Sequence, residues 1–265
     1  MKRRPIARWI ALLFVCALSG CQVAVRTMEA PNLFVGVTPS METMARGLIE
    51  AYRLAYPQET PLQITLSSPD EIRSDLAQGR VSAVLQWNPP APEDWTAVIG
   101  WTGIVFIVNL QNSIDNLSRD QAREVFLGLI NRWEDVGGPT GDIHRLAFEP
   151  DQDMESLFQG IVLDSDQMAN GFQTVPAPYA MKEEIRKDKY SIGYLLGFDV
   201  PQEVRPLTVD HVTAEYTNLI SAKYPFRVPI YLISKNPVPA AVLQFAGWAQ
   251  SVAGQSVFLT MHSWE

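Results

Sequence analysis

The sequence is poor in the residues that build most catalytic and metal centres. It has two cysteines, Cys16 and Cys21, which are too few for a zinc ribbon or a disulfide framework. Its three histidines lie far apart, without the spacing typical of metal ligands: His144, His211 and His262. It contains neither a glycine-rich phosphate loop nor a G-x-S-x-G elbow. These absences argue against an enzyme, and we expect no metal and no other cofactor.

Basic charge is also scarce. The chain has 21 lysines and arginines against 29 acidic residues, a net charge of -8, which argues against a nucleic-acid partner. Hydrophobic residues make up 47% of the 265 residues, and the mean hydropathy is -0.01. This composition supplies a globular core but not several membrane spans. The length fits one large domain or two modest ones.

The N-terminus has the pattern of an export signal. Basic residues precede the apolar run 9–18, which is too short for a membrane-spanning helix. The run ends in Leu18-Ser19-Gly20-Cys21, which resembles the lipobox of bacterial lipoproteins. That resemblance implies cleavage before Cys21 and attachment of diacylglycerol to its thiol. The alternative is an ordinary secretory peptide in which Cys21 is incidental.

The expected mature protein is acidic and lipid-anchored. Cleavage after residue 20 removes four of the 21 basic residues and none of the 29 acidic ones, which leaves a net charge of -12. We therefore predict a signal peptide at 1–20, a tether at 21–32, and an extracytoplasmic protein bound to the bacterial membrane through lipid on Cys21.

The remaining chain alternates strand patterns with helix patterns, which predicts an α/β fold with largely parallel sheets. Expected strands are 33–37, 62–66, 81–85, 104–110, 191–195 and 228–233. Helices are expected to start at 38–40, at Ser68 and at Ser118, the last two with capping boxes, and an amphipathic helix at 240–251 closes the chain.

Two of these helix starts are candidate ligand sites. Thr38, Ser40 and Ser68 each follow a strand and precede a helix, where backbone N–H groups are unpaired. In open α/β sheets, ligands bind beyond the carboxyl ends of the strands. The alternative is that these hydroxyls only cap helices.

Several motifs follow one another in a characteristic order. They are IGWTGIVFIVN at 99–109, LSRDQ at 117–121, VFLG at 125–128, NRWEDVGG at 131–138, SIGY at 191–194, KYPFRVPIY at 223–231 and FAGW at 245–248. In this order and spacing the chain resembles the type II periplasmic solute-binding proteins, specifically the phosphate-binding subunit of bacterial phosphate ABC transporters. The resemblance extends from about residue 33 to residue 264.

The resemblance implies two α/β lobes that bind a small solute in the cleft between them and deliver it to an ABC permease. Crossover segments are expected near 102–108 and 204–209. Lobe 1 would be 33–101 plus 205–265, and lobe 2 would be 102–204. Thr102, at the start of the first crossover, is a further candidate ligand residue.

The ligand loops depart from the family pattern. Where the family has an acceptor aspartate, this chain has Trp87. The family's arginine falls on Phe148 or Glu149, and its Ser-Gly-Thr becomes Gln152-Asp153-Met154. Arg145 is nearby but out of register. The candidate ligand residues in this loop are therefore Gln152, Asp153 and Met154.

These substitutions disfavour a phosphate dianion. The loop has lost the bidentate arginine and gained acidic residues: Glu149, Asp151, Asp153 and Glu155. Two like charges about 5 Å apart at an effective dielectric of 20 cost about 3 kcal/mol, roughly a hundredfold in affinity. Alternatively, the acidic residues only form a solvated helix start. Trp87 is either a stacking platform for a neutral or cationic solute or a core residue.

The sequence as a whole predicts a solute-binding lipoprotein of an ABC-type transporter that does not bind phosphate tightly. Two alternatives stay open. One is a sensory or interaction lipoprotein with a degenerate solute-binding fold. The other is a genuine phosphate or oxyanion receptor with altered loops.

Overall fold

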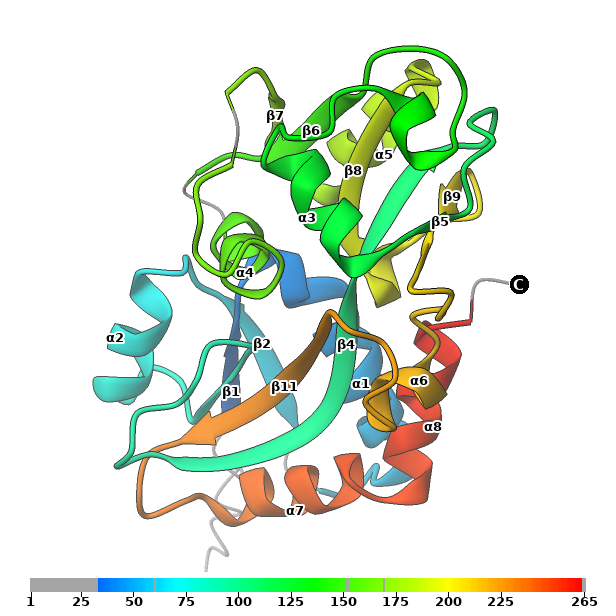
Figure 1. Ribbon diagram of the computed structural model, residues 1–265. Coiled ribbons are helices and arrows are strands. Elements are labelled where there is room, and N and C mark those ends of the chain that lie inside the picture. Colours follow the sequence, from blue (N-terminus) through cyan, green and yellow to red (C-terminus); the bar gives the residue numbers. More distant parts are fainter. Residues whose placement is uncertain (1–32, 60, 151–152, 169, 264–265) are drawn as a thin grey trace, which may run out of the picture. The chain divides into compact units, whose positions relative to one another are not determined.

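The computed structural model describes residues 33–59, 61–150, 153–168 and 170–263, all within one compact unit that spans 32–265. The predicted signal peptide, Cys21 and the tether lie outside the described residues, as do Asp151 and Gln152. Strands and helices alternate along the described chain, so the predicted α/β class is confirmed (Figure 1). No described helix has the length and apolar character needed to cross a membrane.

The strands are β1 (Leu33–Val37), β2 (Leu62–Leu66), β3 (Ala83–Gln86), β4 (Trp95–Asn109), β5 (Asn116–Leu117), β6 (His144–Phe148), β7 (Gln173–Val175), β8 (Ser191–Leu196), β9 (Val204–Pro206), β10 (Thr208–Val209) and β11 (Arg227–Ser234). The α-helices are α1 (Glu42–Ala55), α2 (Glu71–Ala77), α3 (Arg119–Phe126), α4 (Asp153–Ile161), α5 (Pro178–Lys187), α6 (Tyr216–Ile220), α7 (Ala240–Ala249) and α8 (Val252–Met261). Short 3₁₀ turns are η1 (Pro39–Met41), η2 (Trp133–Val136) and η3 (Gly197–Asp199).

The sheet is mixed rather than largely parallel, which corrects the prediction. Its order is β2-β1-β3-β11-β4-β8-β6-β7, with β9 also paired to β4, and β5 and β10 form a separate pair. β1 runs parallel to β2 and β3, and β6 runs parallel to β7 and β8. The difference arises because β11 inserts antiparallel between β3 and β4, while β4 runs antiparallel to β8 and β9.

Strand β4 connects two groups of strands (Figure 1). Its residues 95–103 pair with β11, and its residues 104–109 pair with β8 and β9. We call β1, β2, β3, β11 and residues 95–103 the first strand group, and β6, β7, β8, β9 and residues 104–109 the second. At the change of partner, the Ile104 N–H donates to the Phe226 carbonyl, and the Tyr224 hydroxyl donates to the Ile104 carbonyl at 2.7 Å.

Local sequence signals account for most of the helices. The helix expected after residues 38–40 is α1, whose buried residues follow helical spacing: Met44, Ala45, Leu48, Ile49 and Tyr52. The predicted capping box is present at α3: the Gln121 N–H donates to Ser118 Oγ, and the Ser118 N–H donates to Gln121 Oε1. The closing helix is two helices, because α7 ends at Ala249 and Ser251 caps α8 by accepting from the Gly254 N–H.

The second strand group is covered by an aromatic cluster that fixes α4. Phe158 of α4 stacks on Tyr194 of β8 with ring centroids 3.8 Å apart, and Phe106 and Phe126 pack edge-on against Phe158. All four side chains are buried. This packing holds the first turn of α4 at the border with the first strand group.

Candidate functional site

The two loops predicted to bind a ligand contact each other directly. Ser40 Oγ lies 2.8 Å from Oδ1 and 2.6 Å from Oδ2 of Asp153, so the hydroxyl donates to the carboxylate. The Thr38 and Ser40 hydroxyls lie 3.1 Å apart. Ser40 and Asp153 are each 7% exposed. The structure therefore brings together three residues from the predicted set: Thr38, Ser40 and Asp153. The group beside the two hydroxyls is the carboxylate of Asp153, which belongs to the chain itself.

The Asp153 carboxylate lies at two helix starts. It belongs to the first residue of α4, and it accepts from Ser40 in η1, directly before α1. Burial raises its pKa above the ordinary value, while hydrogen bonds from Ser40, Thr38 and the Met154 and Asp153 backbone act in the opposite direction. These donors and the positive helix ends are the features that favour an anion. In this protein the anion is intramolecular.

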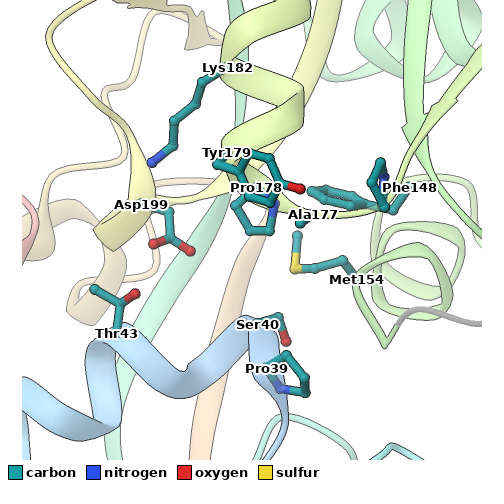
Figure 2. A pocket seen from close by; sticks show the side chains of 11 residues that line it. Pro39, Ser40, Thr43, Phe148, Met154, Ala177, Pro178, Tyr179, Lys182 and Asp199 are labelled. Carbon is teal, nitrogen blue, oxygen red and sulfur yellow. The ribbon is translucent and has the colours of Figure 1, made fainter.

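A pocket of about 290 Å³ opens beside this contact. Its lining comes from η1, α1, β6, α4, α5, η3 and the loop before α5: Pro39, Ser40, Thr43, Phe148, Met154, Pro176, Ala177, Pro178, Tyr179, Lys182 and Asp199. Figure 2 shows Ser40 and Thr43 along one side and Phe148 with Met154 at one end. Lys182 and Asp199 lie toward the other end, so the charged and the apolar parts of the lining are separated.

Lys182 and Asp199 give the pocket its charge. Lys182 belongs to the second turn of α5, and Asp199 ends η3 after β8. Burial raises the pKa of Asp199 to about 6, and the charge of Lys182 acts to lower that pKa. Among the described residues, neither side chain forms an ion pair with the other or with a third group.

The remaining candidates lie at different places. Met154 lines the pocket, whereas Ser68 is exposed. Ser68 exchanges the predicted hydrogen bonds with Glu71, but α2 begins at Glu71 with Asp70 as its N-cap, so the predicted helix start at Ser68 is wrong. Trp87 is 5% exposed and packs in the hydrophobic core, as in the core alternative. Gln152 lies outside the described residues. The pocket lining contains neither Ser68 nor Trp87.

Thr102 lies inside the protein, next to a buried histidine. It is fully buried in β4, and its Oγ1 lies 3.2 Å from Nε2 of His262. His262 Nδ1 lies 2.7 Å from the Phe258 carbonyl, which can only accept, so Nδ1 carries the proton and the Thr102 hydroxyl donates to Nε2. Burial lowers the pKa of His262 to about 4, which keeps the imidazole neutral.

Arg145 is used structurally rather than for a ligand. It lies on β6, and its guanidinium donates to the carbonyls of Val125 and Ile130 and to the Asn131 side chain. Of the two residues predicted to correspond to the family's arginine, Phe148 is a buried apolar residue in the pocket lining, whereas Glu149 is not part of that lining. The described pocket therefore has Lys182 as its cation in place of an arginine. Among the described residues, no cluster of side chains is suited to a metal ion.

Sequence reasoning missed Lys182, Asp199, Thr43 and Tyr179. Lys182 stands in the segment MKEEIRK, which has the charge alternation of an exposed helix face. Asp199 follows a buried strand, and this position at a strand end is the one signal that pointed to a ligand role. The other two are ordinary helix residues in sequence.

The chain belongs to the PBP superfamily, because the family model described as "PBP superfamily domain" matches residues 24–252. Among individual proteins it is similar to the phosphate-binding protein PstS of Bacillus subtilis, with 25% identity over 160 residues. The aligned part covers 60% of this chain and 53% of that protein, so the chain matches about half the length of this relative.

Solved structures show the same fold. One is a phosphate ABC transporter substrate-binding protein with bound phosphate from Clostridium perfringens, with a TM-score of 0.75 and 19% identity over 87% of this chain and 98% of that one. Another is an ABC-type phosphate transport receptor from Vibrio cholerae, with a TM-score of 0.72 and 16% identity over 88% of this chain and 100% of that one. The predicted two-lobed, type II periplasmic-binding-protein fold is thereby confirmed.

Proposed function

We propose that this chain is the extracytoplasmic solute-binding receptor of an ABC-type transporter, with the position of the family's oxyanion taken by its own Asp153 carboxylate. The observation that carries the proposal is the pair of contacts at 2.6 and 2.8 Å between Ser40 and Asp153. The relatives named as phosphate-binding proteins and transport receptors support a receptor role. The pocket beside Ser40 supplies the space for a solute.

The Asp153 carboxylate opposes phosphate in two ways. It uses the Ser40 hydroxyl that would otherwise donate to a ligand, and it places a negative charge where a dianion would lie. A like charge about 5 Å away costs about 3 kcal/mol at an effective dielectric of 20. No arginine lines the described pocket to offset this repulsion. Catalysis forms no part of the proposal.

Calorimetric titration of the full chain, purified in mild detergent, with inorganic phosphate tests this function. We expect no measurable binding at millimolar phosphate for the natural protein. Asp153→Ser removes the charge and frees Ser40, and it should improve the phosphate affinity by at least about tenfold. Glu203→Ser removes the same charge from an exposed residue outside the pocket and should not. Micromolar phosphate binding to the natural protein, lost in Ser40→Ala, would instead establish a genuine phosphate receptor.

Membrane attachment through Cys21 is part of the same proposal and rests on the lipobox-like segment at 18–21. We expect the natural chain to sediment with membranes and to incorporate labelled fatty acid. Cys21→Ser should abolish the label. A soluble, unlabelled natural chain would point to an ordinary secretory signal. Reconstitution with a permease, followed by solute uptake, then separates a transport receptor from a sensory protein.

A further inference from the structure

The pocket beside Ser40 has a divided lining that points to one class of solute. Its charged end holds one cation and one anion, and its other end is apolar. Resting on the proposed receptor function, we propose that this pocket binds a small zwitterion, with an ammonium and a carboxylate at one end and an apolar body at the other. Asp199 would bind the ammonium, Lys182 the carboxylate, and Phe148 with Met154 the apolar body.

The charged end favours a zwitterion because Lys182 and Asp199 are not paired with each other. Both side chains are partly buried, and among the described residues neither has an ion-pair partner. A solute that is only a cation would leave the Lys182 ammonium without a partner inside the occupied pocket. A solute that is only an anion would leave Asp199 without one. Both cases are costly, because a charge removed from water without a partner is destabilised.

The start of α5 strengthens the carboxylate side. Ala177, Pro178 and Tyr179 line the pocket, and they form the N-cap and first turn of this ten-residue helix. Pro178 has no N–H, but the positive end of the helix and the Lys182 ammonium, one turn further along, act on the same space. The first turn of α5 carries no acidic residue that would neutralise them.

The ammonium side depends on Asp199. Its carboxylate is partly buried, and burial raises its pKa to about 6 although the charge of Lys182 acts to lower it. An ammonium placed beside it would supply that compensation. Lys182 and Asp199 lie at the same end of the cavity, where one solute can contact both charges.

The apolar end sets the shape and size of the solute. Phe148 and Met154 are buried, and the nearby prolines Pro39, Pro176 and Pro178 add apolar surface with little freedom to rearrange. The cavity of about 290 Å³ is at the small end of ligand pockets, which span about 300–1,000 Å³. A free α-amino acid with an apolar side chain has this combination of charges, size and shape.

L-Leucine and L-phenylalanine are the probes for calorimetric titration of the full chain in mild detergent at pH 7.5. For each probe, the matched amine lacks the carboxylate and the matched acid lacks the ammonium; for leucine these are 3-methylbutylamine and 4-methylpentanoate. We expect at least one amino acid to bind, and both of its analogues to bind at least about tenfold more weakly.

Two variants assign the charges. Lys182→Met should weaken binding of the amino acid and leave the affinity for the matched amine unchanged. Asp199→Asn should weaken binding of the amino acid and leave the affinity for the matched acid unchanged. Lys223→Met and Asp70→Asn make the same changes at exposed residues and should not alter the affinity for the amino acid or for its analogues. Denaturant unfolding of each variant confirms that it is folded.

The proposal is overturned if neither amino acid binds, if an analogue binds as tightly as its parent, or if both pocket variants bind like the natural protein. These outcomes are separate from the phosphate titration. If neither the amino acids nor phosphate bind, the zwitterion site is ruled out but the proposed function is not. Tight phosphate binding that depends on Ser40 would rule out the proposed function.

Discussion

The Ser40 hydroxyl donates to the Asp153 carboxylate at 2.6 Å, although 113 positions separate these residues in the chain. The contact joins the start of α1 to the start of α4, which pack with different strand groups. Both residues are buried, so the hydrogen bond is shielded from water, and it is charge-assisted when its carboxylate acceptor is ionised. It stabilises this arrangement without a solute.

A double-mutant cycle measures that stabilisation. Ser40→Ala leaves a buried carboxylate short of one donor and should lower the free energy of unfolding by about 2 kcal/mol. Asp153→Asn and the double variant complete the cycle, and we expect a coupling of about 1–2 kcal/mol from urea unfolding. Ser68→Ala, at an exposed position, is the matched serine control and should cost less. A coupling near zero would show that the contact contributes nothing to stability.

His262 should make the protein sensitive to mild acid. Its pKa in the folded protein is lowered to about 4 from the ordinary 6.5, so the unfolded chain takes up the proton first. Stability from this group is therefore complete above about pH 6.5 and is lost as the pH falls toward 4. With 1.36 kcal/mol for each pH unit, the loss is about 3 kcal/mol.

Urea unfolding at pH 7 and pH 4 tests this expectation against a variant. His262→Gln should lower the stability at pH 7 yet lose about 3 kcal/mol less than the natural protein between the two pH values. His211→Asn is the control, because this exposed residue has a positive φ of 62° that asparagine tolerates. Equal acid losses in His262→Gln and the natural protein would contradict the assignment.

The Tyr224 hydroxyl should stabilise the place where β4 changes partners. It is buried and donates to the Ile104 carbonyl at 2.7 Å. Tyr224→Phe removes this donor while keeping the ring, and it should cost about 1 kcal/mol in chemical unfolding. Tyr231→Phe makes the same change on a partly exposed residue of β11, and we expect a smaller effect there. An unchanged stability in Tyr224→Phe would show that this bond is not needed.

Asp199 should reduce stability at neutral pH. Its pKa is raised to about 6 from the ordinary 3.8, so the folded protein holds the proton more tightly than the unfolded chain does. The stability contributed by the neutral form is present below about pH 4 and is lost as the pH rises through 6. Asp199→Asn should therefore raise the free energy of unfolding by about 1–2 kcal/mol at pH 7.5 and change it little at pH 4. A variant less stable at both pH values would contradict this account.

Local patterns predicted the regular elements well and failed where strand pairing decides the outcome. Strands such as β1 and β2 were predicted at their full bounds because their apolar runs are short and clearly bordered. β4 begins at Trp95, nine residues before the predicted start, because residues 95–103 lack the continuous apolar run of 104–109. Its pairing with β11 supplies the order that the local sequence does not show.

The site was predicted in its parts but not in its arrangement. Ser40 was identified from its place at a helix start and Asp153 from the resemblance to the family's ligand loop, yet a direct bond between them depends on how distant segments pack. Asp153 was expected to repel a ligand anion; in the structure its carboxylate accepts from Ser40, which was itself a candidate ligand residue. Lys182 and Asp199 could not be singled out, because a lysine on a polar helix face and an aspartate in a turn are common in exposed positions.

The change of partner along β4 takes place between consecutive residues, since Gly103 pairs with β11 and Ile104 with β8. The strand has no unpaired spacer in which a rotation of one group against the other could be absorbed. Any such rotation must distort the hydrogen-bonded residue pairs next to the Gly103–Ile104 peptide before those in the middle of either strand group. In deuterium exchange, amides beside the junction should therefore label earlier than those of Ile107 and Val108, which lie further along the same strand.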